Sequence, residues 1–307
     1  VNFIEFINSV YDEAPVPLHR PVFFGNERTY VTDTIDSNFV SSVGPMVKEF
    51  EDKIANYVGT KHAIATVNGT SALHAALIVC GVLPGDEVIC QALNFVATAN
   101  AVTYAGANPV FIDVDIDCMG MSPTALESWL LDNVKMKNGD AYNKNTGARI
   151  SACVPMHTFG MPCRVEKLME VCEEFGISLL EDAAESFGSF VGEFHTGTFG
   201  KLGIFSFNGN KIITTGGGGM IVTDSDHLAL RAKHITTTAK VSHPWEFYHD
   251  EVAFNYRMPN LNAALGCAQL ENFSVMLEVK RELAQKYKVF FEANKVNFIK
   301  AIKGTKS

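Results

Sequence analysis

The sequence lacks features that define several functional classes. It has no apolar run of the roughly 20 residues that a membrane-spanning helix needs, and acidic residues stand near its start instead of the basic leader of a signal peptide. Its 307 residues carry a net charge of −9, whereas nucleic-acid and anionic-membrane partners require a basic surface. We therefore expect a cytoplasmic protein that binds neither a nucleic acid nor a membrane.

Paired cysteines and common nucleotide-binding motifs are also missing. None of the seven cysteines belongs to a C-x-x-C pair, and their odd number leaves one unpaired in any disulfide scheme, so we expect free thiols and no metal site. Ile221 and Val222 stand where the glycine run 216–219 would need the last glycine of G-x-G-x-x-G. No G-x-x-x-x-G-K-[ST] motif occurs either, which argues against dinucleotide-binding and P-loop proteins.

Short apolar runs alternate with helical segments from about residue 45 to 235. This rhythm predicts a mostly parallel sheet between two layers of helices. The predicted strands are 62–67, 86–91, 108–115, 150–156 and 177–182, followed by a strand pair at 203–207 and 218–225. The predicted helices are 3–11, 45–59, 70–81, 95–105, 123–133, 164–175, 260–273 and 277–295, and the polar stretch 134–150 is predicted to be a surface loop.

Ligands of open parallel sheets collect at the carboxyl ends of the strands. After strand 62–67, Gly69, Thr70 and Ser71 open a helix whose N–H groups, hydroxyls and dipole can hold a phosphate. An ordinary helix cap would also explain the hydroxyls. Asp182 ends another buried strand, where a carboxylate requires a cation or a strong donor, or serves as a cap.

Two further strand ends carry candidate residues. Lys211 lies between an apolar strand and four glycines, where a lysine can form a Schiff base with an aldehyde, although a loop lysine beside a glycine turn is the simpler interpretation. Phe95 opens a helix and can stack on a planar ligand, or belong to the core. Together these sites provide the amine, acid, stacking ring and phosphate cradle that pyridoxal phosphate (PLP) needs.

The motifs resemble those of the DegT-type sugar-nucleotide aminotransferases, which have the fold-type I aminotransferase architecture. The shared stretches follow the family's order: "VPLHRPVFFGNE", "FVSSVGP", "VNGTSALHAAL", "LNFVATANAV", "VPMHTFGMP", "EDAAESFGS", "HTGTFGKLGIFSFNGNKIITTGGGG" and "FNYRMPNLNAALG". The resemblance implies a large PLP-binding α/β domain followed by a small α+β domain. We expect an N-terminal segment over 1–35, the large domain over 36–245, and the start of a truncated small domain over 246–307.

The resemblance also implies roles for individual residues. Lys211 matches the lysine that forms the imine with PLP and moves protons, Asp182 the partner of the pyridine nitrogen, and Phe95 the stacking residue. Several others match cofactor-binding positions: Gly69, Thr70, Ser71 and Ser206 at the phosphate, and Glu185 near the ring oxygen. Asn255 matches a residue that reaches the phosphate from the partner subunit, which implies a homodimer with the active site at its interface.

The substrates implied by the resemblance are an amino acid, with glutamate as the expected donor, and a 4-keto-6-deoxy sugar linked to UDP or GDP. The product would be a C4 amino sugar for a surface polysaccharide or glycan. His157, His234 and Lys240 are candidates for contact with this substrate, although each has an equally simple structural explanation. Two alternatives remain: a PLP-dependent sugar-nucleotide dehydratase, whose relatives carry histidine in place of the imine lysine, and a non-catalytic PLP- or sugar-nucleotide-binding regulator.

Overall fold

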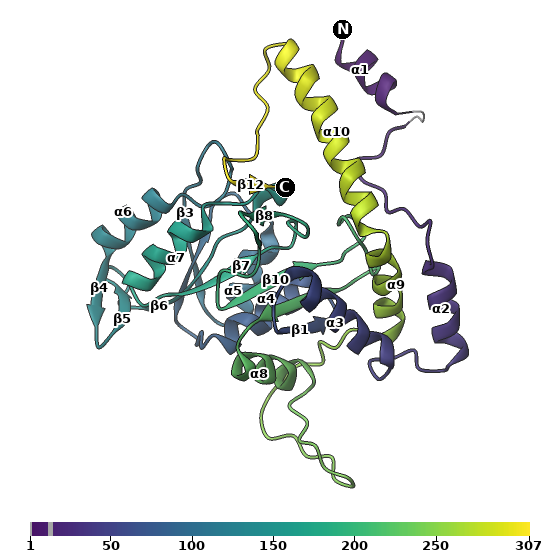
Figure 1. The fold of residues 1–307 in the computed structure, drawn as a ribbon. Coiled ribbons are helices and arrows are strands. Elements are labelled where there is room, and N and C mark those ends of the chain that lie inside the picture. Colours follow the sequence, from purple (N-terminus) through teal and green to yellow (C-terminus); the bar gives the residue numbers. More distant parts are fainter. Residues whose placement is uncertain (1, 12–14) are drawn as a thin grey trace.

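A mostly parallel sheet forms the centre of the molecule (Figure 1). The computed structural model describes residues 2–11 and 15–307, and within them nine strands join this sheet. Across it, the strands follow the order β1 (His62–Thr66), β11 (Gly219–Thr223), β10 (Leu202–Ser206), β7 (Ser178–Asp182), β6 (Arg149–Val154), β2 (Glu87–Gln91) and β3 (Asn108–Ile112). Neighbours from β10 to β3 are parallel, whereas β11 is antiparallel to both β1 and β10. The predicted α/β class is confirmed.

Successive residues of the strands face opposite layers, as the two-residue period of a strand requires. In β10, Ile204 packs into a core with one set of helices and Phe205 into a core on the other face. The first face is covered by α4 (Gly69–Val79), α5 (Val96–Tyr104) and α8 (Asp226–Thr236). The second face is covered by α3 (Pro45–Val58), α6 (Pro123–Asn133), α7 (Val165–Glu174) and α9 (Asn260–Glu271).

The polar stretch 134–150, predicted to be a loop, is instead mainly a β-hairpin. Strands β4 (Val134–Lys137) and β5 (Asp140–Asn143) are antiparallel, and β5 extends the main sheet beside β6. The two residues between them, Asn138 and Gly139, both have positive φ angles, at 55° and 89°. Asn-Gly favours this two-residue turn because both residues tolerate the left-handed conformation. Because the strands on this exposed edge are polar, the stretch was interpreted as a loop.

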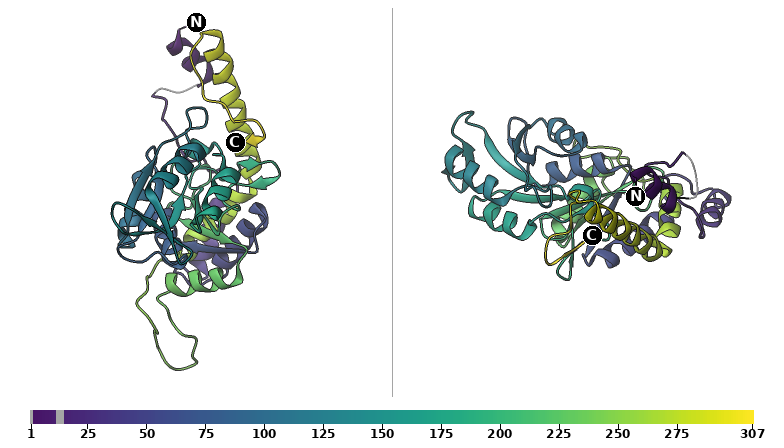
Figure 2. Two further views of the ribbon diagram at one scale, coloured as in Figure 1. Left: turned by 90° about the vertical axis from the view of Figure 1, so that its left-hand side faces the viewer. Right: turned by 90° about the horizontal axis from the view of Figure 1, so that it is seen from above.

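Three features extend from the sheet domain. Helix α10 (Phe273–Ala293) leans away from the body, and α1 (Phe3–Val10) packs beside its far end (Figures 1 and 2). Near the C-terminus, β12 (Thr305–Lys306) joins β8 (Phe190–Val191) and β9 (Phe194–His195) in a small sheet. Residues 237–256 form an arm that projects beyond α8 (Figure 2). The remaining described helices are α2 (Glu27–Asp36) and the short 3-10 helix η1 (Thr158–Gly160).

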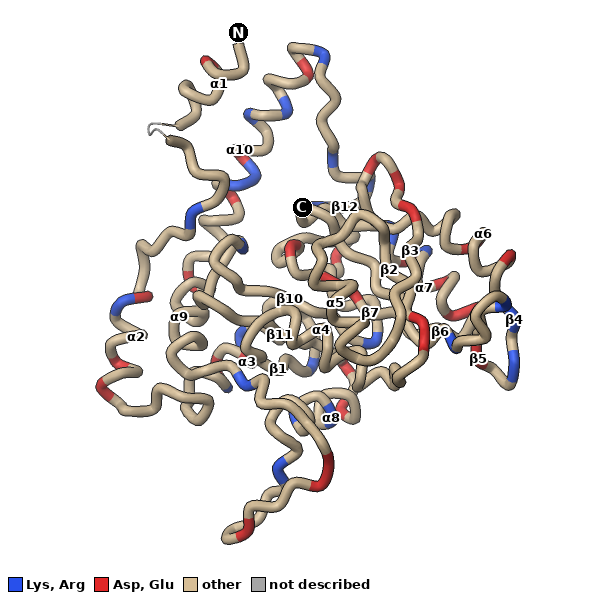
Figure 3. Tube along the Cα trace, turned by 180° about the vertical axis from the view of Figure 1, so that it is seen from behind, with Lys and Arg blue, Asp and Glu red and all other residues tan. Residues whose placement is uncertain are grey.

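The acidic residues Asp12 and Glu13, which follow the predicted first helix, lie outside the described residues. All seven cysteines are free thiols. None of the helices in the described part of the chain combines the length and apolarity needed to cross a membrane. Acidic and basic residues are interspersed along the chain (Figure 3). The division into segments 1–35, 36–245 and 246–307 stays a prediction.

Candidate active site

Predicted site residues meet at one edge of the sheet. Because β11 is antiparallel to both of its neighbours, β1 and β10 run in the same direction and end at the same edge. Thr66, Gly219 and Ser206 lie side by side in register at these ends. Asp182 ends β7 and aligns with Ile204 of β10. The pairing of the strands therefore assembles segments that are more than 100 residues apart in the sequence.

The beginning of α4 forms a small cradle at this edge. The side chain of Asn68 accepts a 2.8 Å hydrogen bond from the Ser71 amide, so this N–H group is already used. Among the described residues, the amides of Gly69 and Thr70 have no hydrogen-bond acceptor, as is usual in the first turn of a helix. These free donors at the positive end of the helix dipole suit a phosphate group.

Glycine is required where the cradle meets its neighbours. A Cβ atom at Gly69 would lie 2.9 Å from the Cβ atom of Ser206, and one at Gly219 would lie 2.4 Å from the carbonyl oxygen of Asn68. The hydroxyl of Ser206 is therefore held close to the first turn of α4. Only residues without a side chain permit this approach of two backbone segments.

Asp182 is a buried carboxylate next to the cradle, with 5% of its surface exposed. Its Oδ2 atom accepts a 2.7 Å hydrogen bond from the Thr98 hydroxyl, and its Oδ1 atom accepts one of 3.2 Å from the Ala184 amide. Burial raises the pKa of Asp182, while these two hydrogen bonds and the charge of Lys211 act in the opposite direction. A carboxylate in this position favours a positively charged or protonated partner.

Lys211 follows β10 in a tight loop and forms an ion pair with Glu185. Its Nζ atom donates a 3.1 Å hydrogen bond to Oε1 of Glu185, and 15% of its side chain remains exposed. Both residues line a pocket of about 390 Å³, together with Ser206 and Ala184. The amine is thus accessible to a ligand and lies beside the same strand end as the cradle. This contact places Glu185 next to the lysine that the sequence predicts to be reactive.

Two phenylalanines are exposed near this edge. Phe95 is the N-cap residue of α5 and 67% of its surface is exposed, so it does not belong to the core. Phe159 lines the pocket with 73% of its surface exposed, and its φ angle of 55° is left-handed. Unusual backbone angles of non-glycine residues concentrate at functional sites. Phe159 was not among the predicted site residues, since no local sequence signal specifies its backbone angle.

His157 is a fully buried residue whose ring contacts other parts of the protein. Its Nδ1 atom accepts a hydrogen bond from the Cys163 amide, so the ring proton on Nε2 is available to Glu181 at 3.0 Å. Glu181, also buried, accepts three further hydrogen bonds from the amides of Gly197, Phe199 and Gly200. In this arrangement neither ring nitrogen of His157 is available to a substrate.

The other tentative substrate residues and Asn255 lie outside the pocket. His234 contacts Asp250 at 2.7 Å, and the Lys240 ammonium group lies 4.4 Å from the ring centre of Phe247 in the arm. Asn255 is exposed near the base of the arm, where it accepts a hydrogen bond from Arg257. None of these residues lines the pocket beside Lys211 in this single chain.

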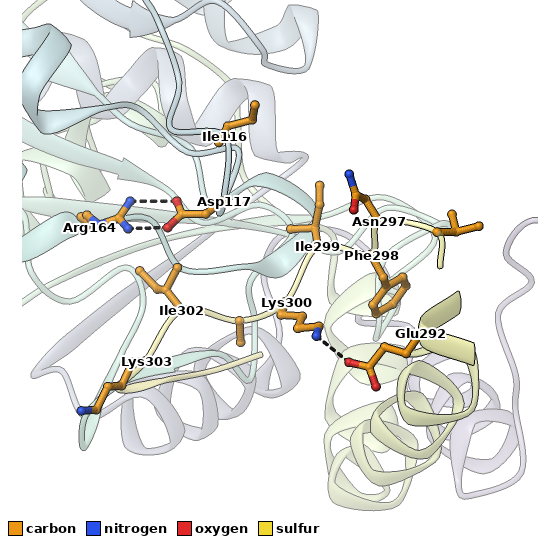
Figure 4. Close-up of a pocket in the computed structure, with 12 residues that line it drawn as sticks. Ile116, Asp117, Arg164, Glu292, Asn297, Phe298, Ile299, Lys300, Ile302 and Lys303 are labelled. Atoms are coloured by element: carbon orange, nitrogen blue, oxygen red, sulfur yellow. Dashed lines mark hydrogen bonds and ion pairs between the residues drawn. The ribbon is translucent and has the colours of Figure 1, made fainter. Parts of the chain in front are cut away.

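A second pocket, of about 740 Å³, lies between residues 296–303 and Arg164 (Figure 4). Four of its charged side chains are already paired, Arg164 with Asp117 and Lys300 with Glu292, as Figure 4 shows. It contains none of the residues predicted to bind a cofactor. Although this pocket is larger, the chemical groups favour the pocket beside Lys211 as the active site.

The residues at this edge fit pyridoxal phosphate. The cofactor requires an amine for its aldehyde, donors for its phosphate and an acid for its ring nitrogen. Lys211, the first turn of α4 and Asp182 provide these three groups at adjacent strand ends. Burial of Asp182 without a cationic partner in direct contact further supports a positively charged ligand group beside it.

Comparison with known proteins identifies the family. The sequence pattern of the DegT/DnrJ/EryC1/StrS aminotransferase family matches residues 24–306. The chain belongs to this family. The predicted family, the aminotransferase class and PLP as the cofactor of this class are confirmed.

Individual relatives of this family member agree with that assignment. EpsN of Bacillus subtilis, provisionally named a pyridoxal phosphate-dependent aminotransferase, is 39% identical over 271 residues, which cover 88% of this chain and 67% of EpsN. The GDP-perosamine synthase of Vibrio cholerae is 38% identical over 273 residues, which cover 89% of this chain and 70% of that protein. The crystal structure of DesI in the presence of its TDP-sugar product matches with a TM-score of 0.76 and 28% identity, covering 89% of this chain and 65% of DesI. The chain thus spans about two-thirds of the length of these relatives.

Proposed function

We propose that this protein is a PLP-dependent aminotransferase that transfers an amino group from glutamate to C4 of a 4-keto-6-deoxy sugar linked to UDP or GDP. The observation that carries the proposal is the position of Lys211, accessible in a pocket and adjacent to the strand ends that hold Asp182 and Ser206. A GDP-perosamine synthase and DesI, with its TDP-sugar product, are among the relatives, which supports a sugar nucleotide as substrate.

In this proposal, each of the site residues at this edge of the sheet has a role. The Gly69 and Thr70 amides and the hydroxyls of Ser71 and Ser206 hold the phosphate of the cofactor. Asp182 keeps a proton on the ring nitrogen, so that bound PLP can act as an electron sink.

Lys211 would provide the amine that holds the cofactor through its aldehyde, and would move the proton at the substrate carbon. Glu185 accepts a hydrogen bond from this amine and orients it toward the pocket. Phe95 has an exposed ring, which would stack on the flat face of the cofactor.

We further propose that the active form is a homodimer in which Asn255 of one subunit contributes to the site of the other. The arm that ends near Asn255 carries exposed apolar residues, among them Trp245 at 85% and Phe247 at 82% exposure. Exposed apolar groups on a projecting segment favour burial against another protein surface. Sedimentation analysis of the wild type and of a variant with Trp245→Ser and Phe247→Ser tests this proposal, and a variant that remains dimeric would contradict the role of the arm.

The visible absorption spectrum of the purified protein tests the proposed activity. Addition of PLP should produce the absorption of cofactor bound to a lysine, and addition of glutamate should remove it. Keto-sugar nucleotides can then be screened for restoration of the first spectrum. A protein that binds PLP but shows no change with glutamate or with other amino acids would support the alternative of a non-catalytic binding protein.

A further inference from the structure

The pocket beside Lys211 has a cationic wall that the proposed function does not use. His19 contributes from the segment that precedes α2, and Lys280 and Arg281 contribute from α10. The Nζ atom of Lys280 lies 3.3 Å from Nδ1 of His19. Two segments that are 261 residues apart in the sequence therefore meet at the mouth of the pocket.

His19 connects this wall to the reactive lysine. Burial lowers the pKa of His19, the neighbouring charge of Lys280 lowers it too, and a hydrogen bond with the backbone of Lys211 acts in the opposite direction. The ring is therefore neutral at pH 7, and its Nδ1 atom can accept a hydrogen bond from the Lys280 ammonium group. His19 orients Lys280 relative to the loop that carries Lys211.

Lys280 keeps donors available for a ligand. An ammonium group has three N–H donors, and the contact with His19 uses one. The side chain is exposed at the pocket mouth, and desolvation by the surrounding protein lowers its pKa. Among the described residues, no carboxylate forms an ion pair with Lys280.

Arg281 adds a second positive charge next to it. Its guanidinium group donates to the carbonyl oxygen of Gly188 and to a backbone oxygen of Ser307, and these contacts fix its position. Lys211 differs from Lys280 because Glu185 balances its charge. The charge of Lys280 is therefore one that an anionic ligand would balance.

We propose that Lys280, oriented by His19, binds an anionic oxygen group of a substrate while its reacting carbon is at Lys211. This inference rests on the proposed aminotransferase function. Two sources provide such a group: the carboxylates of the amino-acid donor and the diphosphate of the sugar nucleotide. Both substrates use the same pocket in turn, so one lysine can serve either of them.

Two measurements on the full chain separate these sources. The apparent affinity for L-glutamate is obtained from the change in visible absorption of the PLP-loaded protein. The affinities for GDP and UDP are obtained by calorimetric titration, which does not require turnover. The variants are Lys280→Met, Lys280→Arg and the matched control Lys286→Met, which removes another exposed lysine of α10 that does not line the pocket.

We expect Lys280→Met to weaken the binding of glutamate, of the nucleoside diphosphates, or of both by about 10-fold. Lys280→Arg should keep most of the affinity, and Lys286→Met all of it. The limiting rate at saturating glutamate should be unchanged in Lys280→Met, because the side chain binds the substrate and does not transfer its proton. His19→Ala should produce a smaller loss for the same ligand and none in combination with Lys280→Met.

The outcomes distinguish this inference from the proposed function. A loss for glutamate alone assigns the carboxylate, and a loss for GDP or UDP alone assigns the diphosphate. Affinities of Lys280→Met equal to those of Lys286→Met for all three compounds would overturn the inference, and so would a wild type that binds none of them. A wild type that binds GDP or UDP through Lys280 but shows no spectral change with amino acids would contradict only the aminotransferase proposal.

Discussion

The hydroxyl of Thr98 donates a 2.7 Å hydrogen bond to Oδ2 of Asp182, although the two residues come from different β-α units. Thr98 lies in the first turn of α5, and Asp182 is the last residue of β7. This contact fixes the orientation of a carboxylate whose pKa is raised by burial. The orientation suits a carboxylate that keeps a proton on a cofactor ring. Burial of this carboxylate lowers the stability of the protein without cofactor.

Replacement of Asp182 by asparagine should stabilise the protein without cofactor at neutral pH. The raised pKa means that the folded protein binds this proton more tightly than the unfolded chain, so ionisation destabilises the fold as the pH rises. The difference in melting temperature between Asp182→Asn and the wild type should therefore be largest above pH 7. It should shrink as the pH falls toward the pKa of an unfolded aspartate, about 3.9.

Melting curves over a range of pH, together with PLP titration, check this prediction. Asp132→Asn, at an exposed position of α6, is the control and should not change the pH dependence. The stabilised Asp182→Asn variant should bind PLP more weakly and lose at least about 100-fold in transamination. A variant that is less stable than the wild type at all pH values would contradict the account of Asp182.

Replacement of Lys211 by alanine should abolish the reaction while the fold remains intact. The side chain contacts Glu185 at the surface of a pocket, so its removal leaves no buried cavity. Loss of a proton-transferring group alone costs about 100- to 10,000-fold in rate, and loss of the covalent link adds to it.

Reduction with borohydride followed by peptide mass analysis locates the modified lysine directly. The wild type should carry the reduced cofactor on Lys211, and Lys211→Ala should carry none. Lys135→Ala, which changes an exposed lysine of β4, should behave as the wild type. Reduced cofactor on a different lysine of the wild type would contradict the assignment.

Replacement of Gly69 by alanine should weaken both the fold and PLP binding. The added Cβ atom would lie 2.9 Å from Cβ of Ser206, and overpacking of this kind costs about 1–3 kcal/mol of unfolding free energy. The second change Ser206→Gly removes that contact and should recover part of the stability, but not the affinity for PLP.

Chemical denaturation and PLP titration separate these two effects. Gly209→Ala is the matched control for stability, since a Cβ atom there meets no other atom within 4 Å. Equal losses of stability in Gly69→Ala and Gly209→Ala would show that the close approach to Ser206 is not the cause.

Replacement of Glu181 by alanine should destabilise the fold strongly. Its carboxylate accepts hydrogen bonds from three backbone amides and from His157, and their loss leaves buried donors without partners. We expect a loss of about 3 kcal/mol or more of unfolding free energy. The control Glu127→Ala changes an exposed glutamate of α6 and should have little effect.

Comparison of the unfolding free energy with the affinity for the sugar nucleotide distinguishes a structural His157 from a substrate-binding one. His157→Asn should lower the unfolding free energy and leave the apparent affinity for the sugar nucleotide unchanged. A selective loss of that affinity with full stability would instead support the substrate contact that the sequence suggested.

The positions of the residues at the strand ends could be predicted from the sequence. A strand that leads into a helix defines the end of the strand, and parallel strands end at one edge, so Asp182 and the 69–71 turn could be predicted to share a site. The alternation of Ile204 and Phe205 between two cores follows from the period of two. These inferences depend only on local pattern and on general rules of α/β topology.

Other features depend on contacts between distant segments. The Asn138-Gly139 hairpin was interpreted as a loop because its strands are polar, and pairing with β6 decides its structure. His157 resembled a substrate residue until Glu181 and the Cys163 amide accounted for its ring. No pattern along the chain brings His19 to Lys280.

The sequence by itself determined the family, the α/β class, the cofactor and the residues that end the strands, because these depend on local periodicity and on ordered motifs. Only the tertiary structure decided which polar and charged groups meet: Lys211 with Glu185, Asp182 with Thr98, and Lys280 with His19. The physical reason is that hydrogen bonds and ion pairs act over a few ångströms in space, and the separation of residues along the chain does not specify those distances.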